Sequence, residues 1–225
     1  MSNDKTIQID EKLNFFNELL LQMVTRVEEA LLKATVAFRD HDVEMAKKVI
    51  ADDYFIDQMR EMIENDAVRL LISEAPYAHY MRVVIAGLKM VTSLERMGDH
   101  AAHLAKVASK LGTAQNDEIL IVDKIVEMAN ADAAMFREAT VALSKTDAVA
   151  AKEIAKKDNI IDNYRKEINT MIYEANSNLK SSKNYDNELF ELFYLVKELE
   201  RLGDHVTTIC KWIVYMKEGE KPELN

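Results

Sequence analysis

The chain has 225 residues, of which 48% are hydrophobic and 30% are charged, and it contains only five Gly and two Pro. So few turn-forming residues argue against a hairpin-rich sheet protein, whereas many Ala, Leu, Glu and Lys residues are typical of long helices. The net charge of −10 disfavours binding to nucleic acid or to anionic lipid surfaces, and it favours cations or a basic protein surface as partners.

The first half of the chain predicts three long helices. The first covers about residues 9–38, where apolar side chains recur in alternating steps of three and four. A turn at residues 40–42 ends it and caps a second helix that closes near Ser73. Pro76 fits the first turn of a third helix, which runs to Leu111 just before Gly112.

Three more helices are predicted in the second half. One covers about residues 122–143, with Asp132 interrupting its apolar stripe at an expected wet edge. The next starts at Thr146-Asp147 and continues as a single helix to a polar loop over residues 176–187. The last begins near Glu188 and ends at Gly219 and Pro222.

A repeated motif relates the two halves. Leu94-Glu95-Arg96-Met97-Gly98-Asp99-His100 recurs as Leu199-Glu200-Arg201-Leu202-Gly203-Asp204-His205, 105 residues later. The pair Asp53-x-x-x-Asp57 recurs at the same offset as Asp158-x-x-x-Asp162. We therefore predict an all-α protein of two tandem three-helix bundles, six long antiparallel helices in all, related by internal duplication, with lobes at residues 9–112 and 116–218.

Carboxylates four residues apart lie on one face of a helix, so each lobe should carry four of them in an open acidic groove between two adjacent helices. One interpretation is that each groove binds hard metal ions through oxygen ligands. The other is a solvated face paired with Arg96, Arg201, Lys48 or Lys156. The candidate metal ligands are Asp53, Asp57, Glu95 and Asp99 in the first lobe, and Asp158, Asp162, Glu200 and Asp204 in the second.

Other repeated residues suggest packing roles. Gly98 and Gly203 would permit close approach of a neighbouring helix or of a bound ion. His100 and His205 are expected to form hydrogen bonds or to pack, before any role as metal ligands. Cys210 is the single cysteine, expected in the core, and it fits a reducing cytoplasm.

No targeting or membrane segment is evident in the sequence. The beginning of the chain lacks the apolar run of a signal peptide. The most apolar stretch, Val83 to Val91, is interrupted by Lys89 and is too short to cross a bilayer. We therefore expect a cytoplasmic protein that does not insert into the membrane.

No catalytic residues are predicted. The chain has no Gly-x-Ser-x-Gly, no phosphate-binding glycine loop and no Glu-x-x-His, which a di-iron oxidase would need. Metal-assisted phosphoester hydrolysis ranks behind binding functions, because an outward-facing site lacks a dry pocket. A metal-binding helical scaffold that regulates some transporter or buffers cations remains an alternative.

The doubled Leu-Glu-Arg-x-Gly-Asp-His, each preceded by an Ile-Asp pair (Ile56-Asp57 and Ile161-Asp162), resembles the PhoU family of phosphate-transport accessory proteins. The likeness spans about residues 15–217, although Tyr80 stands where the family usually has Asp. It implies a regulator that is not an enzyme and that carries multinuclear clusters of Fe, Zn or Mn on the two carboxylate sets. The implied partners are the ATPase of a phosphate ABC transporter, a phosphate-sensing histidine kinase and a second copy of the chain in a homodimer.

Overall fold

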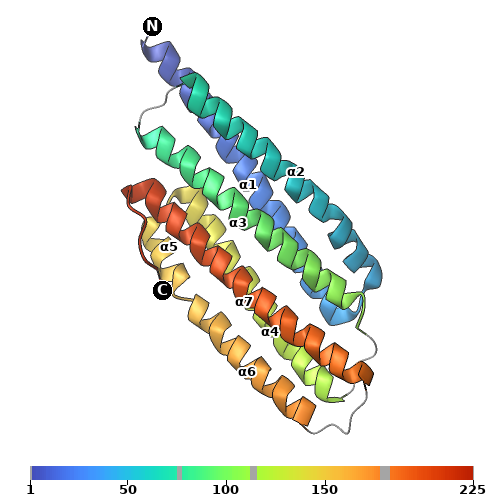
Figure 1. The fold of residues 1–225 in the computed structure, drawn as a ribbon. Helices are drawn as coiled ribbons and strands as arrows, with labels where there is room; N and C mark the ends of the chain where they lie inside the picture. Colours follow the sequence, from blue (N-terminus) through green and yellow to red (C-terminus); the bar gives the residue numbers. More distant parts are fainter. Residues whose placement is uncertain (1, 75–77, 112–115, 178–182, 225) are drawn as a thin grey trace.

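A computed structural model describes residues 2–74, 78–111, 116–177 and 183–224 of the chain. Helices are the regular structure in these residues, which contain no strand. The first bundle consists of α1 (Ser2–Asp40), α2 (Val43–Glu74) and α3 (Ala78–Ala108). The second consists of α4 (Asn116–Lys145), α5 (Ala148–Ala155), α6 (Asp158–Ser177) and α7 (Lys183–Glu218). The predicted fold class, two duplicated helical bundles in tandem, is confirmed (Figure 1).

The two turns that were predicted from helix-capping residues, at Asp42 and at Asp147, are present in the structure. Asp42 accepts a hydrogen bond from the Met45 amide at 2.9 Å, and the Asp147 carboxylate accepts from the amides of Val149 and Ala150. These contacts satisfy amides that have no partner in the first turn of a helix. The third helix ends at Ala108 rather than Leu111, and the last begins at Lys183 rather than near Glu188. Pro76 and Gly112 lie outside the described residues.

One predicted helix is wrong in detail, because the fifth helix is divided into α5 and α6. The chain tightens at Lys156 and Lys157, where the Lys157 amide bonds to the Ile154 carbonyl at 2.9 Å and the Ile160 amide to the Lys157 carbonyl at 2.8 Å. These three-residue steps interrupt the α-helical register. The break makes Asp158 the first residue of α6, where the helix dipole favours a negative charge. In the first lobe, α2 continues through the equivalent position.

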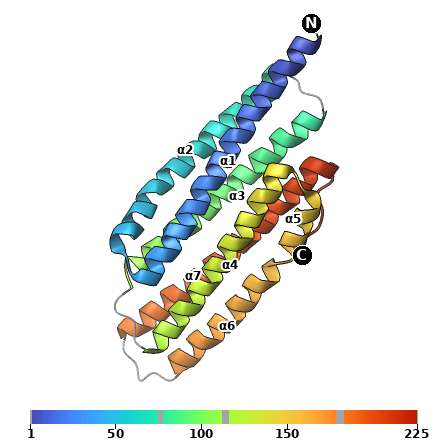
Figure 2. The ribbon, with the colours of Figure 1, turned by 180° about the vertical axis from the view of Figure 1, so that it is seen from behind.

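The two lobes pack along the central helices α3 and α7, which lie side by side (Figure 1). Behind them α1 lies along α4 (Figure 2). Buried apolar side chains from both lobes form one cluster, which includes Phe16, Leu94, Phe136 and Leu199. The repeated motif therefore sits at the middle of the molecule. One face of α3 is left for α2, and the corresponding face of α7 is left for α6.

In the part of the chain that the structure describes, no helix combines the length and the apolar character needed to cross a membrane.

Candidate metal centres

The first acidic quartet lies between α2 and α3, which pack against each other. Asp53 and Asp57 come from α2, and Glu95 and Asp99 come from α3. Gly98 lets the two helices approach closely, because a Cβ atom there would lie 3.1 Å from the Asp53 Oδ1 and 3.0 Å from the Ile56 Cδ1. Burial, followed by the charges of the other three carboxylates, raises the pKa of Asp53 to about 6.

The second quartet has the same arrangement between α6 and α7. Asp158 and Asp162 come from α6, and Glu200 and Asp204 come from α7. A Cβ atom on Gly203 would lie only 2.8 Å from the Asp158 Oδ1. Burial raises the pKa of Asp158 to about 6, and the three other carboxylates add to the shift. Each quartet therefore acts electrostatically as one cluster.

The predicted open groove is correct only in part, because one carboxylate of the first quartet is buried, whereas none of the second quartet is. Asp57 and Asp204 are exposed, and Asp53 and Asp158 are half-buried. Glu95, in contrast, retains only 8% of its exposure. The prediction of an outward-facing site is wrong for this residue because α3 is the central helix, covered by α1, α2 and α7. Its pKa is raised by burial and then by Asp99.

An arginine at equivalent positions covers each quartet. Arg60 Nη1 lies 3.3 Å from the Glu95 carboxylate, and Arg165 Nε lies 3.5 Å from that of Glu200. The two arginines are 105 residues apart, so they obey the same offset as the carboxylates. Neither was predicted from the sequence, although the offset was a usable signal.

The cations that the sequence did suggest have mixed roles. Arg96 lies 3.0 Å from Asp99 and 3.4 Å from Glu95. Arg201 instead pairs with Glu198 at 3.3 Å, and Lys156 pairs with Glu153 at 2.6 Å. Surface pairing therefore accounts for part of the acidic charge in the first lobe, as the alternative interpretation expected, but Arg201 and Lys156 pair with carboxylates outside the quartets.

Asp132 on α4 contradicts its predicted place at a wet edge. The side chain is fully buried, with 0% exposure, because α4 packs against α1, α6 and α7. Neither carboxylate oxygen has a hydrogen-bond partner among the residues that the structure describes. Burial, and then the charge of Asp158, raises the pKa of Asp132 well above its ordinary value. The side chain adjoins the second quartet, since its Oδ1 is 3.3 Å from the position of a Gly203 Cβ.

The donor set of both centres suits a hard cation, because it consists of carboxylate oxygens facing one another from two helices. Within the described residues, both buried oxygens of Asp132 lack a hydrogen-bond partner, and a cation would supply one. In the described residues, however, no three Asp, Glu, His or Cys side chains converge tightly enough to hold one ion as they stand. Mutual repulsion of like charges explains that separation, and binding would require side-chain rotation.

The repeated histidines lie at the boundary between the lobes. The His100 Nδ1 is 2.6 Å from the Glu198 carboxylate, and the rings of His100 and His205 are 5.6 Å apart. Burial lowers the pKa of His205 to about 4. These contacts agree with the predicted packing and hydrogen-bonding role. Cys210 is buried as expected, and burial raises the pKa of its thiol to about 12, which makes it unreactive.

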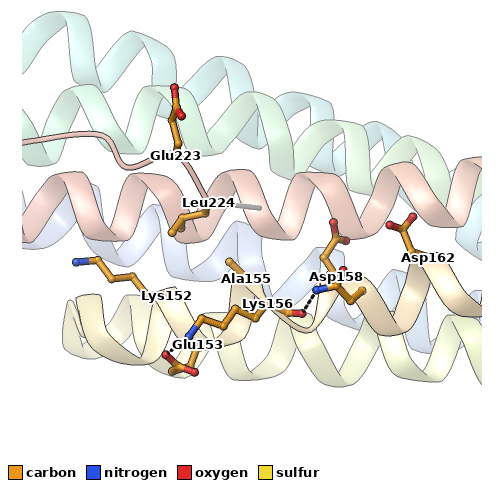
Figure 3. Close-up of a pocket in the computed structure, with 9 residues that line it drawn as sticks. Lys152, Glu153, Ala155, Lys156, Asp158, Asp162, Glu223 and Leu224 are labelled. Carbon is orange, nitrogen blue, oxygen red and sulfur yellow. Dashed lines mark hydrogen bonds and ion pairs between the residues drawn. The ribbon is translucent and has the colours of Figure 1, made fainter.

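A cavity of about 420 Å³ adjoins the second quartet at the break between α5 and α6. Its lining includes Asp158 and Asp162, and Leu224 from the C-terminal tail. Figure 3 shows both carboxylates turned toward α7, whereas Lys156 and Glu153 point away on the far side of α5. Lys152, also in the lining, is bound to Glu218 at 2.8 Å. The lysines are thus neutralised by neighbours, and the cavity leaves the acidic face of Asp158 and Asp162 accessible.

Two helical bundles joined along α3 and α7, each with an acidic quartet on a pair of facing helices, define a class of duplicated all-α proteins with paired carboxylate centres. The family model described as PhoU domain matches residues 20–108 and again residues 125–213. The chain belongs to the PhoU family.

Related proteins match this chain over nearly its whole length. The phosphate-specific transport system accessory protein PhoU homolog of Clostridium acetobutylicum is 31% identical over 207 residues, 92% of either chain. That of Streptococcus pneumoniae is 31% identical over 222 residues, 97% of this chain and 99% of the relative.

Solved structures share the fold. The crystal structure of the phosphate transport system regulatory protein PhoU from Streptococcus pneumoniae superposes with a TM-score of 0.87 at 30% identity, covering 96% of this chain and all of that one. The crystal structure of PhoU from Pseudomonas aeruginosa gives a TM-score of 0.86 at 26% identity, over 94% of this chain and 99% of the other.

Proposed function

We propose that this protein is a metal-binding regulator of phosphate uptake that works as an adaptor in the cytoplasm. It restrains a phosphate ABC transporter through its ATPase and holds a phosphate-sensing histidine kinase in its phosphatase-competent state. The observation that carries the proposal is the family membership over both halves of the chain, together with relatives named as accessory proteins of phosphate-specific transport. The duplicated acidic quartets supply the features through which such an adaptor would bind its cofactor.

The proposed cofactor is a multinuclear cluster of Fe, Zn or Mn on each quartet. Burial raises the pKa of Asp53 and Asp158, and repulsion from the other carboxylates adds to it. Bound cations would remove that repulsion. They would also join α2 to α3 and α6 to α7, which stiffens the surface that these helices present. The metal-dependent shape of that surface would carry the regulatory signal.

The partners are proposed from charge. A chain with a net charge of −10 is attracted to basic patches on a transporter ATPase or a kinase, and electrostatic attraction speeds encounter most at low salt. The proposal includes no catalytic role. The candidate centres are partly exposed, and no nucleophile with an adjacent base was recognised in the sequence.

A homodimer is proposed on the basis of exposed apolar side chains. They recur on the outer face of α2 and at the beginning of α7: Tyr54, Phe55, Met62, Val68, Ile72, Phe190, Phe193 and Tyr194. Large exposed apolar side chains gathered on helix faces are typical of interfaces. Light scattering should give twice the chain mass, and a monomer at all concentrations would contradict this part of the proposal.

The function is tested by replacing one centre in the cell. The double variant E200Q/D204N should lose about half of the metal found in the wild type, and it should raise phosphate uptake or switch on phosphate-starvation genes in phosphate-rich medium. The control is D123N/E127Q, which neutralises an exposed acidic pair with the same spacing on α4. It should change neither quantity.

Deletion of the gene should have the same effect on uptake and on starvation genes. If deletion leaves both unchanged in the absence of a second copy, the phosphate proposal is wrong. If the purified wild-type protein nevertheless binds metal, the alternative function, a metal-binding scaffold that serves another transporter, replaces the phosphate proposal.

A further inference from the structure

The two acidic centres are not equivalent, because one residue breaks the duplication beside them. Asp132 of the second lobe corresponds to Val27 of the first at the offset of 105 residues. Val27 is fully buried in apolar surroundings, as expected for a bundle core. A buried valine at this position shows that the packing of the bundle does not require a polar side chain there. The carboxylate of Asp132 therefore needs another explanation.

We infer that Asp132 is a fifth, buried carboxylate ligand of the second centre, and that it gives this centre the higher affinity for a hard divalent cation such as Mn²⁺. The inference rests on the proposed metal binding and adds to it. It assigns to Asp132 a role that neither the repeated motif nor the offset indicates, since the residue has no acidic counterpart in the first lobe.

The burial of Asp132 points to a ligand. A carboxylate withdrawn from water loses much of its hydration energy, and proteins normally recover it with hydrogen bonds or an ion pair. Both oxygens of Asp132 are without a partner in the described part of the chain, although the side chain is entirely buried. A cation shared with the neighbouring quartet would satisfy both.

The geometry directs Asp132 to the second quartet. The position that a Cβ atom of Gly203 would take is close to both side chains. It lies 3.3 Å from the Asp132 Oδ1 and 2.8 Å from the Asp158 Oδ1. Carboxylates from α4 and α6 thus meet over the bare backbone of α7, and the three helices lie together in the lower half of Figure 1. A larger residue at position 203 would separate the two oxygens.

The charge difference sets the order of affinities. With Asp132 the second centre has five carboxylates, and its ion pairs include one arginine, Arg165. The first centre has four carboxylates, and its ion pairs include two arginines, Arg60 and Arg96. An additional carboxylate in a buried setting strengthens the attraction for a divalent ion more than an exposed one does. All-oxygen sets of this kind favour hard ions, Mn²⁺ among the transition metals.

The test uses the full chain with the first centre disabled by E95Q/D99N, and Mn²⁺ alone as the probe. D132N and D132V are made in that background. The valine of D132V is the residue that the first lobe has at the equivalent position, Val27. Mn²⁺ binding is followed by electron paramagnetic resonance of the free ion, and thermal unfolding is measured with and without Mn²⁺. The control D123N removes a carboxylate from the exposed side of the same helix.

Both Asp132 variants should bind Mn²⁺ at least about tenfold more weakly than their parent. Loss of a group that only supports a ligand already lowers metal affinity by about tenfold, and loss of a direct ligand should lower it at least as much. They should also unfold at a higher temperature than the parent without metal, and gain less from added Mn²⁺. D123N should match the parent in every measurement. The D132N variant, which keeps the shape of the side chain, guards against a packing effect of D132V.

The outcomes separate the inference from the proposed function. If the parent binds Mn²⁺ and D132N and D132V bind it equally well, Asp132 is only a buried acid and the inference is wrong, while metal binding stands. If neither the wild type nor the parent binds Mn²⁺, Fe or Zn, the metal part of the proposed function is wrong and the inference falls with it.

Discussion

The imidazole of His100 and the carboxylate of Glu198 join the two lobes through a buried contact of 2.6 Å. The contact is not duplicated, because the residue equivalent to Glu198 in the first copy is Ser93. Both partners are nearly inaccessible to solvent, with 7% and 8% exposure. A buried hydrogen bond to a charged group contributes more to the free energy of unfolding than a surface ion pair does. This one pair should therefore stabilise the contact between the two lobes.

Replacing Glu198 by Ala should lower the free energy of unfolding by about 2 kcal/mol, because it leaves the His100 ring buried without its acceptor. Glu191→Ala is the matched control. Glu191 also reaches from α7 to the first lobe, but its contact with Lys110, in the turn after α3, is 3.5 Å long and exposed, so the loss should be below about 1 kcal/mol. Urea unfolding measures both. Equal losses would show that the His100 contact has no special weight.

Arg165 should compete with bound metal, since its guanidinium lies over Glu200 at 3.5 Å and near Asp162 at 3.8 Å. Arg165→Gln removes that positive charge, so Mn²⁺ binding at the second centre should become several-fold tighter. The control is Arg137→Gln, an arginine that pairs with Glu28 away from both centres. Calorimetric titration with Mn²⁺ decides the point. Weaker binding by Arg165→Gln would mean instead that the arginine positions Glu200 as a ligand.

Gly203→Ala should damage the second centre although alanine favours helices by about 1 kcal/mol over glycine. The new methyl group would lie 2.8 Å from the Asp158 Oδ1, closer than van der Waals contact allows. Asp158 must rotate away, and the metal content of the protein should fall by about half, as in E200Q/D204N. Elemental analysis after loading gives the result. Unchanged metal content would show that Asp158 is not a ligand in its present position.

The sequence predicted the fold well because each level of signal agreed with the next. Apolar steps of three and four set the helices, and Asp42 and Asp147 marked the turns by capping. The break between α5 and α6 was not predictable in this way. Lys156 and Lys157 are good helix formers, and neither Gly nor Pro marks the site. The chain departs from the α-helix there without a local signal of the kind that sequence patterns provide.

The candidate site was predictable where the duplication applied and not where it failed. The carboxylates, and in principle Arg60 and Arg165, follow from the offset of 105 residues. The role of Asp132 does not follow from the offset. A polar residue within an apolar stripe is compatible with a solvent-exposed edge of the helix and equally with a buried carboxylate. The burial of Asp132 depends on how α4 sits among α1, α6 and α7. That depth is a property of tertiary packing, which periodicity in one helix does not contain.

The pH dependence of stability should reveal Asp53 and Asp158 directly in the metal-free protein. Their pKa values rise from 3.8 to about 6 on folding, so the folded chain binds more protons than the unfolded chain between those limits. The free energy of unfolding contributed by these groups therefore falls as pH rises from about 4 to 6, and the loss is complete above that range. His205 acts in the opposite sense, because its pKa is lowered from 6.5 to about 4 on folding.

A comparison of the wild type with D53N/D158N isolates the two carboxylates, because asparagine mimics the protonated acid and leaves His205 in place. The two proteins should be equally stable near pH 4, and the variant should be more stable at pH 7, by about 1 kcal/mol for each replaced group after allowance for solvent screening. Added Mn²⁺ should reverse the order at pH 7, because the ion binds the ionised carboxylates of the wild type and stabilises the folded state. Urea unfolding at both pH values, with and without Mn²⁺, measures each quantity. A variant whose advantage is the same at pH 4 and pH 7 would show that these carboxylates are ionised without cost in the fold, and the repulsion on which the metal proposal depends would be absent.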